Sequence, residues 1–381
     1  MFTPIKRIIT SQVKIDKYML SFSQMKCFFT ILLCQNAVFA QFVGIKNIYS
    51  NTKMQEFKCT NNCSHVEGII DYVDLPPWKN VSLGQSGFSA KQITVPFDIY
   101  VEVLLSVDEK LYEKVGKWYS NGIWNRNEIN PELTLGDPEE EIVLYVRKFM
   151  TAVNFRYENK FPTPNIKLHI ANILIDKEAT FVKRHPDNND AVDAYKTLDN
   201  MPGYFGGKSY RNITFDIVIF LTGENKLCGE ECKSEPRLNG IAFTGGACFG
   251  SGKMYGSAIV QDRGAFTGVD TAAHEIGHLL GSTHDGNNNC CCSDDGYIMN
   301  DAWSASNTRQ QNSYKWSKCS CESINKFVRT AQASTCLYNS PSKTPHPLME
   351  WEDLIAPNVP SLVHQCNVSR RTGISVSLVY G

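Results

Sequence analysis

The sequence predicts an α/β fold built on a mixed sheet. Short apolar runs typical of buried strands alternate along the chain with segments of helical periodicity. The composition agrees, because 381 residues with 42% hydrophobic and 20% charged side chains have room for one large domain with smaller flanks, or for two domains. The net charge of −1 gives no indication of nucleic acid or an anionic membrane as a partner.

The first elements of this fold are expected in the second quarter of the chain. Residues 93–107 form an apolar run closed by Asp108, which suits a strand buried on both faces of a sheet. A helix should then begin at Asp137-Pro138, with the aspartate as N-cap and the proline at the first helical position. Its apolar stripe should face the core and consists of Ile142, Val146, Phe149, Met150 and Val153.

Three further strands are expected over residues 166–175, 215–221 and 240–246. The last contains glycines that allow another backbone to approach closely. A helix follows, and its apolar face consists of Ala272, Ala273, Ile276, Leu279 and Leu280. Residues 41–90 are polar and irregular, and no helix or strand pattern is predicted there.

The segment from His274 to Asp285 carries the most specific motif of the chain, H-E-x-x-H-x-x-G-x-x-H-D. Residues four apart lie on the same face of a helix, so His274 and His278 can direct their ring nitrogens to one point. Gly281 can end the helix with a positive φ, which lets the chain turn back and bring His284 to that point. Three neutral imidazoles leave one zinc position open for water, as in catalytic zinc sites.

A short H-E-x-x-H occurs by chance, and paired histidines on a helix are more often surface residues than ligands. The extended motif fixes six positions, and Met299 follows 15 residues after His284. An extended motif with a later methionine is the metzincin pattern. Met299 is expected to form an apolar floor beneath the zinc without binding it. An ordinary core methionine is the alternative interpretation, and the two are physically compatible.

The motif also predicts a mechanism. Glu275 lies one residue round the helix from His274, close to the metal without having to be a ligand. We expect it to accept a proton from water as general base and to pass it to the leaving amine as general acid. One catalytic zinc, held by the three histidines, would lower the pKa of that water and polarise the scissile carbonyl.

Residues 1–40 predict a secretory signal peptide. Lys26 precedes an apolar run that ends in small residues at positions preferred by signal peptidase. A buried core helix is the alternative interpretation of this run, and translation starting at Met19 or Met25 is also compatible with the sequence. After this region, no run of 18 or more apolar residues predicts a membrane span.

Cysteine usage agrees with export. Of the fourteen cysteines, Cys27 and Cys34 lie in the predicted signal and twelve remain, an even number that indicates a disulfide framework in an exported protein. Thiolate binding of a metal is the alternative for the cysteines near the histidine motif. Four N-x-S/T sequons are compatible with glycosylation: Asn62, Asn80, Asn212 and Asn367.

With Asp285 directly after the third histidine, the motif resembles the adamalysin (reprolysin) branch of the metzincin zinc metalloproteases, and the chain is similar to compact reprolysins of arthropod saliva. The similarity extends over further segments: Glu102 to Asp108, Phe215 to Gly223, Gly240 to Cys248, Trp316 to Ser320, and Cys336 to Asn339. It implies a mixed, mostly parallel sheet, a zinc-binding active-site helix and a Met-turn in a smaller C-terminal subdomain.

The same resemblance suggests a domain organisation. The catalytic domain would occupy residues 92–340. Residues 41–91 would form a short propeptide or N-terminal extension, and residues 341–381 a short Pro- and Ser-rich tail that carries a cysteine.

The resemblance also implies structural roles. Asp285 would brace the local fold, and Cys248 would pair with Cys336. Cys319 would pair with one of three consecutive cysteines, but these and the Cys319-x-Cys321 pair depart from the usual spacing; the three are Cys290, Cys291 and Cys292. A structural Ca²⁺ site, favoured by hard oxygen donors, would consist of Glu102, Asp216, Asn339 and the carbonyl of Cys336.

The leading hypothesis is therefore a secreted, monomeric zinc endopeptidase that cleaves extracellular matrix, plasma or cell-surface proteins. By resemblance, the substrate would lie extended along the strand at 240–246 through backbone hydrogen bonds, with Trp303 in the wall of a side-chain pocket. The alternative is a catalytically inactive, metzincin-like protein that binds extracellular or host proteins. Intact Glu275 and all three histidines argue against it, because losing one of them is the usual route to inactivity.

Overall fold

The computed structural model describes residues 72–74, 94–120, 137–158, 160–161, 164–206, 213–229, 232, 238–248, 254–264, 266–286, 291, 295–300 and 312–350. All of them fall within one compact unit, Glu56–Pro360. The predicted signal peptide and the four sequons lie outside the described residues.

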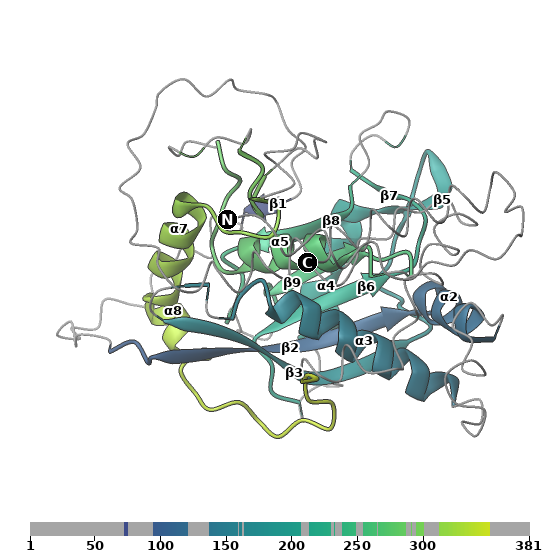
Figure 1. Cartoon of the computed structure of the whole chain (residues 1–381). Coiled ribbons are helices and arrows are strands. Elements are labelled where there is room, and N and C mark those ends of the chain that lie inside the picture. The colour runs from purple at the N-terminus through teal and green to yellow at the C-terminus, as the bar shows by residue number, and fades with distance from the viewer. Residues whose placement is uncertain are drawn as a thin grey trace, which may run out of the picture. The chain divides into compact units, whose positions relative to one another are not determined.

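A mixed sheet of six strands forms the centre of this unit, in the order β1-β8-β9-β6-β2-β3 (Figure 1). Every neighbouring pair runs parallel except β8 and β9, which are antiparallel. The strands are β1 (Tyr72–Asp74), β2 (Asp98–Asp108), β3 (Asn165–Asp176), β6 (Ile217–Thr222), β8 (Gly240–Thr244) and β9 (Ser257–Gln261). This mixed, mostly parallel sheet confirms the predicted fold class.

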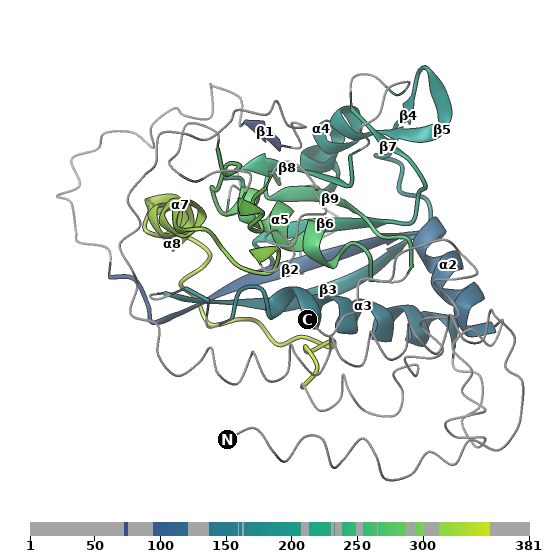
Figure 2. The same ribbon diagram turned by 45° about the horizontal axis from the view of Figure 1, so that its top comes forward.

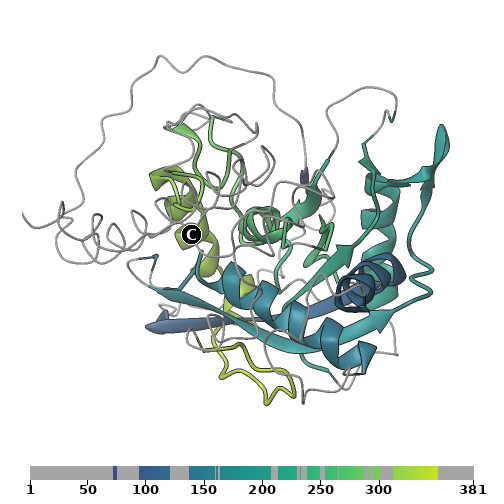
Figure 3. The ribbon, with the colours of Figure 1, turned by 45° about the vertical axis from the view of Figure 1, so that its right-hand side comes forward.

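Helices cover both faces of the sheet. Alternate residues of a strand face opposite sides, so neighbouring residues pack against different helices. Ile217 and Ile219 belong to the core beneath α2 (Glu109–Ser120), α3 (Pro138–Asn154) and α5 (Val269–Leu279). Val218 and Phe220 pack instead with the side chains of α4 (Ala194–Phe205). In Figures 1 and 3, α3 lies along the strands β2 and β3. The result is a three-layer α/β sandwich.

Smaller elements complete the unit. A second sheet has the order β4-β5-β7, with β4 at Arg184–His185, β5 at Asn188–Asp193 and β7 at Leu227–Cys228. Near the C-terminal end of the described chain, α7 (Lys318–Val328) precedes α8 (Ala331–Ser334). The chain keeps contact with the sandwich beyond residue 340, since Arg147 Nε donates to the carbonyl of Pro347 and Met349 N donates to Thr151 Oγ1.

The strand and helix predictions agree with the structure where local sequence carries the signal. Asp137 caps α3 by accepting a hydrogen bond from Glu139 N, and the predicted apolar stripe is buried. Strand β2 is buried along most of its length but begins at Asp98 rather than at residue 93. One prediction is wrong: residues 41–90 are not without regular structure, because β1 forms there by pairing with β8. A three-residue strand is too short to show periodicity in its own sequence.

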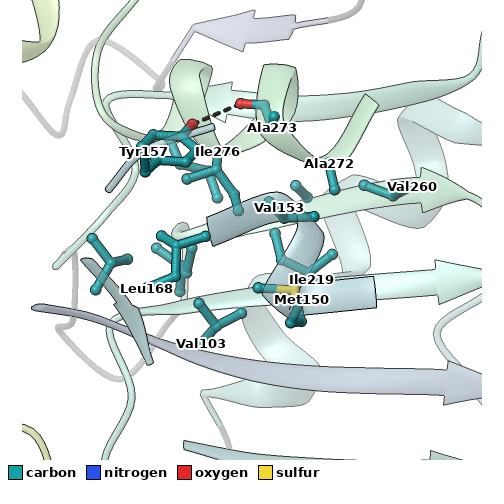
Figure 4. Packing of buried hydrophobic residues seen from close by; sticks show 14 of the residues in the cluster. Val103, Met150, Val153, Tyr157, Leu168, Ile219, Val260, Ala272, Ala273 and Ile276 are labelled. Atoms are coloured by element: carbon teal, nitrogen blue, oxygen red, sulfur yellow. Dashed lines mark hydrogen bonds between the residues drawn. The ribbon is translucent and has the colours of Figure 1, made fainter. Parts of the chain in front are cut away.

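The packing between α3 and α5 positions the candidate site. Figure 4 shows Met150 and Val153 of α3 directed toward the strands and toward Ala272 and Ile276 of α5. The turn before α5 is held by buried Asp262, whose carboxylate accepts hydrogen bonds from Tyr145 Oη at 2.8 Å and Gly264 N at 3.0 Å. The start of α5 is thereby fixed against α3.

Candidate metal centre and active site

The end of α5 brings the three histidines together. Gly281 has φ of +87°, the left-handed conformation expected from the sequence. Its N–H donates to the carbonyl of His278, and Ser282 N donates to the carbonyl of Gly277. This pair of bonds is a Schellman motif. It ends the helix within one residue and reverses the chain, so that His284 reaches the face that carries His274 and His278.

The three imidazoles converge on one point and are buried. His274 Nε2 lies 3.1 Å from His284 Nε2 and 3.0 Å from His278 Nε2. Among the described residues, these three histidines are the one group of three or more His, Cys, Asp or Glu side chains whose ligand atoms lie close enough together to hold a metal ion. Neighbouring nitrogens in a tetrahedral zinc site with Zn–N bonds of about 2.0–2.1 Å are about 3.3 Å apart. The observed spacing matches that value within a few tenths of an ångström.

Backbone carbonyls orient two of the rings. His274 Nδ1 lies 2.6 Å from the carbonyl oxygen of Ile298, and His278 Nδ1 lies 2.8 Å from that of Ser282. A carbonyl accepts hydrogen bonds only, so each Nδ1 carries the proton and each Nε2 keeps its lone pair. Such partners fix the ring orientation and the tautomer of metal-binding histidines. The donor set therefore fits a zinc ion.

The carboxylate of Glu275 lies at the start of strand β8. Glu275 is buried, and a methyl group built on Gly240 would lie 2.4 Å from Glu275 Oε1. Thr271 Cγ2 would be 2.6 Å from the same methyl. The absence of a side chain at Gly240 is therefore what gives the carboxylate its place between α5 and β8.

Met299 lies under the same helix. It is fully buried, and a methyl group built on Gly277 would lie 2.6 Å from Met299 Sδ. The carbonyl of Met299 accepts a hydrogen bond from Asp285 N at 2.8 Å. The turn that contains Met299 is thus tied to the histidine loop, and its neighbour Ile298 orients His274.

Asp285 joins the histidine loop to α7. Its Oδ1 accepts hydrogen bonds from Ser317 Oγ at 2.6 Å and Ser320 Oγ at 3.1 Å. Ser317 is also the N-cap of α7. Burial raises the pKa of the Asp285 carboxyl, while the two serine hydroxyls act in the opposite direction.

The segment just after α3 contacts α5 through residues that the sequence did not indicate. Tyr157, just after α3, donates from Oη to the carbonyl of Ala273 at 2.6 Å, next to the first histidine (Figure 4). Arg156 Nη2 lies 2.9 Å from Asp270 Oδ1 in the first turn of α5. Trp316 donates from Nε1 to the carbonyl of Arg156 and packs against the Tyr157 ring at 4.9 Å. No motif marks Arg156 or Tyr157, because 114 to 160 positions separate them from their partners.

Three of the predicted calcium ligands, Glu102, Asp216 and Asn339, meet at a different place. Glu102 N donates to Asp216 Oδ2 at 2.8 Å, and Asn339 Nδ2 lies 3.3 Å from Glu102 Oε2. Glu102 Oε1 accepts hydrogen bonds from Ser342 N and Ser342 Oγ. Burial, and the negative charge of Glu102, raise the pKa of Asp216 to about 7. Oxygen atoms that could ligate a cation converge here. Ser342 and Asn339 would have to turn their hydrogen-bond donors away from Glu102 before a cation could bind.

Three disulfides join described residues. Cys248 is bonded to Cys336 and Cys291 to Cys319. The third, between Cys228 and Cys232, was not anticipated from the sequence. Cys321 forms no disulfide with any residue that the structure describes, and burial raises the pKa of its thiol to about 12. Two predicted candidates, Cys290 and Cys292, lie outside the described residues, as does Trp303.

In the part of the chain that the structure describes, no helix combines the length and the apolar character that crossing a membrane requires.

Comparison with known proteins shows which family part of the chain resembles. Residues 143–285 match the model of the metallo-peptidase family M12B, Reprolysin-like. A disintegrin and metalloproteinase with thrombospondin motifs-like protein from Bombyx mori is 31% identical over 266 residues, covering 65% of this chain and 34% of the relative. Venom metalloproteinase 2 from Eulophus pennicornis is 29% identical over 202 residues, covering 51% of this chain and 41% of the relative. The chain thus spans less than half the length of either relative.

Among solved structures, metalloproteinase-II from Bacteroides fragilis is similar with a TM-score of 0.38 and 14% identity, covering 69% of this chain and 58% of that chain. The family match covers α3 from residue 143 onward, the strands β6, β8 and β9, and the whole histidine motif. Over residues 143–285, the chain is thus similar to the reprolysin (adamalysin) branch of the metzincin metallopeptidases.

Proposed function

We propose that this protein is a secreted zinc endopeptidase that hydrolyses peptide bonds of extracellular proteins. The observation that carries the proposal is the convergence of three buried imidazoles on one point, with the buried Glu275 next to the first of them on α5. Three histidine ligands leave one zinc position open, which is the arrangement of catalytic zinc sites. The reprolysin family match supports the same chemistry.

In this proposal His274, His278 and His284 hold the zinc, and Glu275 moves the proton. When bound, zinc supplies the Lewis acidity that lowers the pKa of a water molecule and polarises the scissile carbonyl. Glu275 accepts the proton of that water and delivers it to the leaving amine. Burial of Glu275 between α5 and β8 restricts its carboxylate to one position and keeps bulk water away.

Several residues would support this chemistry from outside the reacting groups. Met299 would form the apolar floor beneath the metal, and Asp285 would brace the histidine loop against α7. The disulfides Cys248–Cys336 and Cys291–Cys319 would hold the C-terminal elements in place. We keep residues 92–340 as the proposed catalytic domain, with residues 41–91 as propeptide or extension and 341–381 as tail.

The substrate would lie extended along the outer edge of β8 and pair with it as an added strand. The predicted signal peptide and the similarity to venom enzymes favour export, and therefore matrix, plasma or cell-surface proteins as substrates. We propose that the protein acts as a monomer. Glycosylation at the sequons would accompany export.

Cleavage of a denatured protein by the purified chain, with and without 1,10-phenanthroline, tests the proposal. We expect cleavage that the chelator abolishes and added zinc restores. Cleavage that survives chelation would rule out the zinc mechanism. Absence of cleavage from a folded chain loaded with one zinc would favour the inactive binding protein instead.

We also propose that Glu102, Asp216, Asn339 and the carbonyl of Cys336 bind a structural calcium ion. The support is that the backbone N–H of Glu102 donates to Asp216 Oδ2 at 2.8 Å and that Asn339 Nδ2 donates to Glu102 Oε2 at 3.3 Å. Two neighbouring buried carboxylates suit a divalent cation, which would neutralise their repulsion. Calcium titration of the metal-depleted chain, followed by thermal unfolding, tests this site.

A further inference from the structure

The helix that carries two of the proposed zinc ligands ends against a turn from another part of the chain. Residues 245–247 follow strand β8, and Gly245 N donates to the carbonyl of His278 at 2.8 Å. Ala247 N donates to the carbonyl of Leu279 at 3.1 Å. The last four carbonyls of a helix have no partner within the helix. The turn therefore caps the C-terminal end of α5 from outside, at the second histidine.

One side chain binds both carbonyls of the same turn. Gln332 of α8 donates from Nε2 to the carbonyl of Gly245 at 3.0 Å and to that of Ala247 at 2.6 Å. A side-chain amide nitrogen carries two N–H groups, so it can serve both oxygens at once. Gly245 and Ala247 thus bind α5 through their N–H groups and Gln332 through their carbonyls. The amide of Gln332 and the end of α5 are joined through these two residues.

Gln332 is presented from a backbone that is itself held in place. Thr330 caps α8 by accepting a hydrogen bond from Ala333 N at 3.1 Å. Beyond α8, Cys336 forms the disulfide with Cys248, the residue that directly follows the turn. In Figures 1 and 2, α7 and α8 lie on one side of α5. The position of the amide relative to the turn is therefore fixed at both ends of α8.

An aromatic ring packs at the junction between the turn and the end of α5. A methyl group built on Gly245 would lie 3.7 Å from Phe327 Cε2, and one built on Gly281 would lie 2.9 Å from Phe327 Cβ. Both glycines have a positive φ, +66° and +87°, which a side chain would resist. Phe327 thus touches the turn and the helix end together, and the junction is packed as well as hydrogen bonded.

We infer that Gln332 is a positioning residue of the proposed metal centre, which acts through the turn on His278. His278 is the second-last residue of α5, where helices tend to fray. The turn supplies external partners for the last two carbonyls of α5, and Gln332 fixes the turn. No local pattern indicates this role, because 87 positions separate Gln332 from Gly245. The inference rests on the proposed function, because it concerns a ligand of the same zinc.

The first test compares two variants of the zinc-loaded full chain. Gln332→Met keeps the length of the side chain and removes both donors. Asn200→Leu is the matched control, because Asn200 Nδ2 donates to the carbonyl of Phe181 at 3.0 Å on α4, on the other face of the sheet. Transfer of zinc to an excess of a chromogenic chelator should be about 10-fold faster from Gln332→Met and unchanged from Asn200→Leu. Equal rates from both variants would overturn the inference.

The visible spectrum of the cobalt-substituted chain is a readout that a purely structural role would not move. The absorption bands of Co²⁺ depend on the geometry of its ligands, so they should shift in Gln332→Met and stay in place in Asn200→Leu. A wild-type spectrum in Gln332→Met would reduce Gln332 to a structural contact. If Gln332→Met fails to fold, as judged by near-UV circular dichroism, Gln332→Glu replaces it. That variant keeps the size of the side chain and has no donor for the two carbonyls at neutral pH.

Hydrogen exchange of the metal-free chain separates this inference from the proposed function. The N–H groups of Gly245 and Ala247 should exchange at least ~10-fold faster in Gln332→Met, because they are freed when the turn leaves α5. They should keep their wild-type rates in Asn200→Leu. Unchanged exchange in Gln332→Met would overturn the inference even in a chain that binds zinc. A wild-type chain that binds no zinc would contradict the proposed function, and the exchange rates would still decide whether Gln332 holds the turn to α5.

Discussion

Replacement of Gly240 by alanine should damage catalysis far more than folding. The added methyl would lie 2.4 Å from Glu275 Oε1, 2.6 Å from Thr271 Cγ2 and 2.9 Å from Glu275 Cδ. Non-bonded carbon contacts are optimal at about 3.5–4.0 Å, so the carboxylate must withdraw by about 1 Å. The backbone of β8 can stay in place, because the atoms that clash belong to side chains.

The expected magnitude follows from this geometry. A displacement of about 1 Å at a catalytic group costs about 10²-fold in rate. Overpacking in a core costs about 1–3 kcal/mol, and side-chain ends that can move favour the lower end of that range. Gly240→Ala should therefore lower kcat about 100-fold while lowering the melting temperature by about 2–4 °C.

Steady-state kinetics on a peptide substrate measure kcat, and thermal unfolding measures the melting temperature. Zinc analysis shows whether the metal is still bound. Gly203→Ala is the control, because a methyl group there meets no atom within 4 Å. It should keep wild-type kinetics and gain up to about 1 kcal/mol of stability from the less flexible unfolded chain. Wild-type kcat in Gly240→Ala, with zinc still bound, would refute the position that we assign to the Glu275 carboxylate.

Three further predictions concern the surroundings of the site. Tyr157→Phe removes the 2.6 Å hydrogen bond to the carbonyl of Ala273 and should cost about 0.5–1.5 kcal/mol and lower kcat. Tyr338→Phe loses a similar bond to the carbonyl of Val328, which belongs to α7 and not to α5, and should affect stability alone. Equal kcat in both variants would contradict a role for Tyr157 in positioning α5. Replacing both Cys248 and Cys336 by serine opens a link across 88 residues and should cost about 2–5 kcal/mol in chemical unfolding, so an unchanged midpoint would exclude this disulfide from the folded protein. Because the pKa of Asp216 is raised to about 7, the calcium-free chain should be most stable at low pH with respect to this group, and that contribution should be lost between about pH 4 and pH 7. Calcium should therefore raise the melting temperature more at pH 8 than at pH 5, and an equal rise at both would argue against Asp216 as a ligand.

The histidine site was predictable because its geometry is local. Spacing along one helix places His274 and His278 together, and a single glycine decides how the chain reverses toward His284. The cap of α3 by Asp137 is local in the same sense, since its partner lies two residues away. Such features depend on a few consecutive residues, so the sequence alone contains their physical cause.

The surroundings of the site depend on distant parts of the chain and could not be predicted in the same way. The bond from Tyr157 to Ala273 spans 116 positions, and neither residue type indicates a partner. Strand β1 forms because the outer edge of β8 is there to accept it, and three residues carry no periodicity of their own. The Cys228–Cys232 disulfide depends on how the backbone is placed around β7, which cysteine counting does not reveal.

Metal content and turnover of Glu275→Gln, measured side by side with the wild-type chain, test the central claim most directly. The substitution preserves size and leaves the three histidines and their carbonyl partners untouched. We predict about one zinc per chain in both proteins, with turnover of protein and peptide substrates abolished in Glu275→Gln. Wild-type turnover in a zinc-loaded Glu275→Gln chain would contradict the assignment of Glu275 as the general base of a zinc endopeptidase.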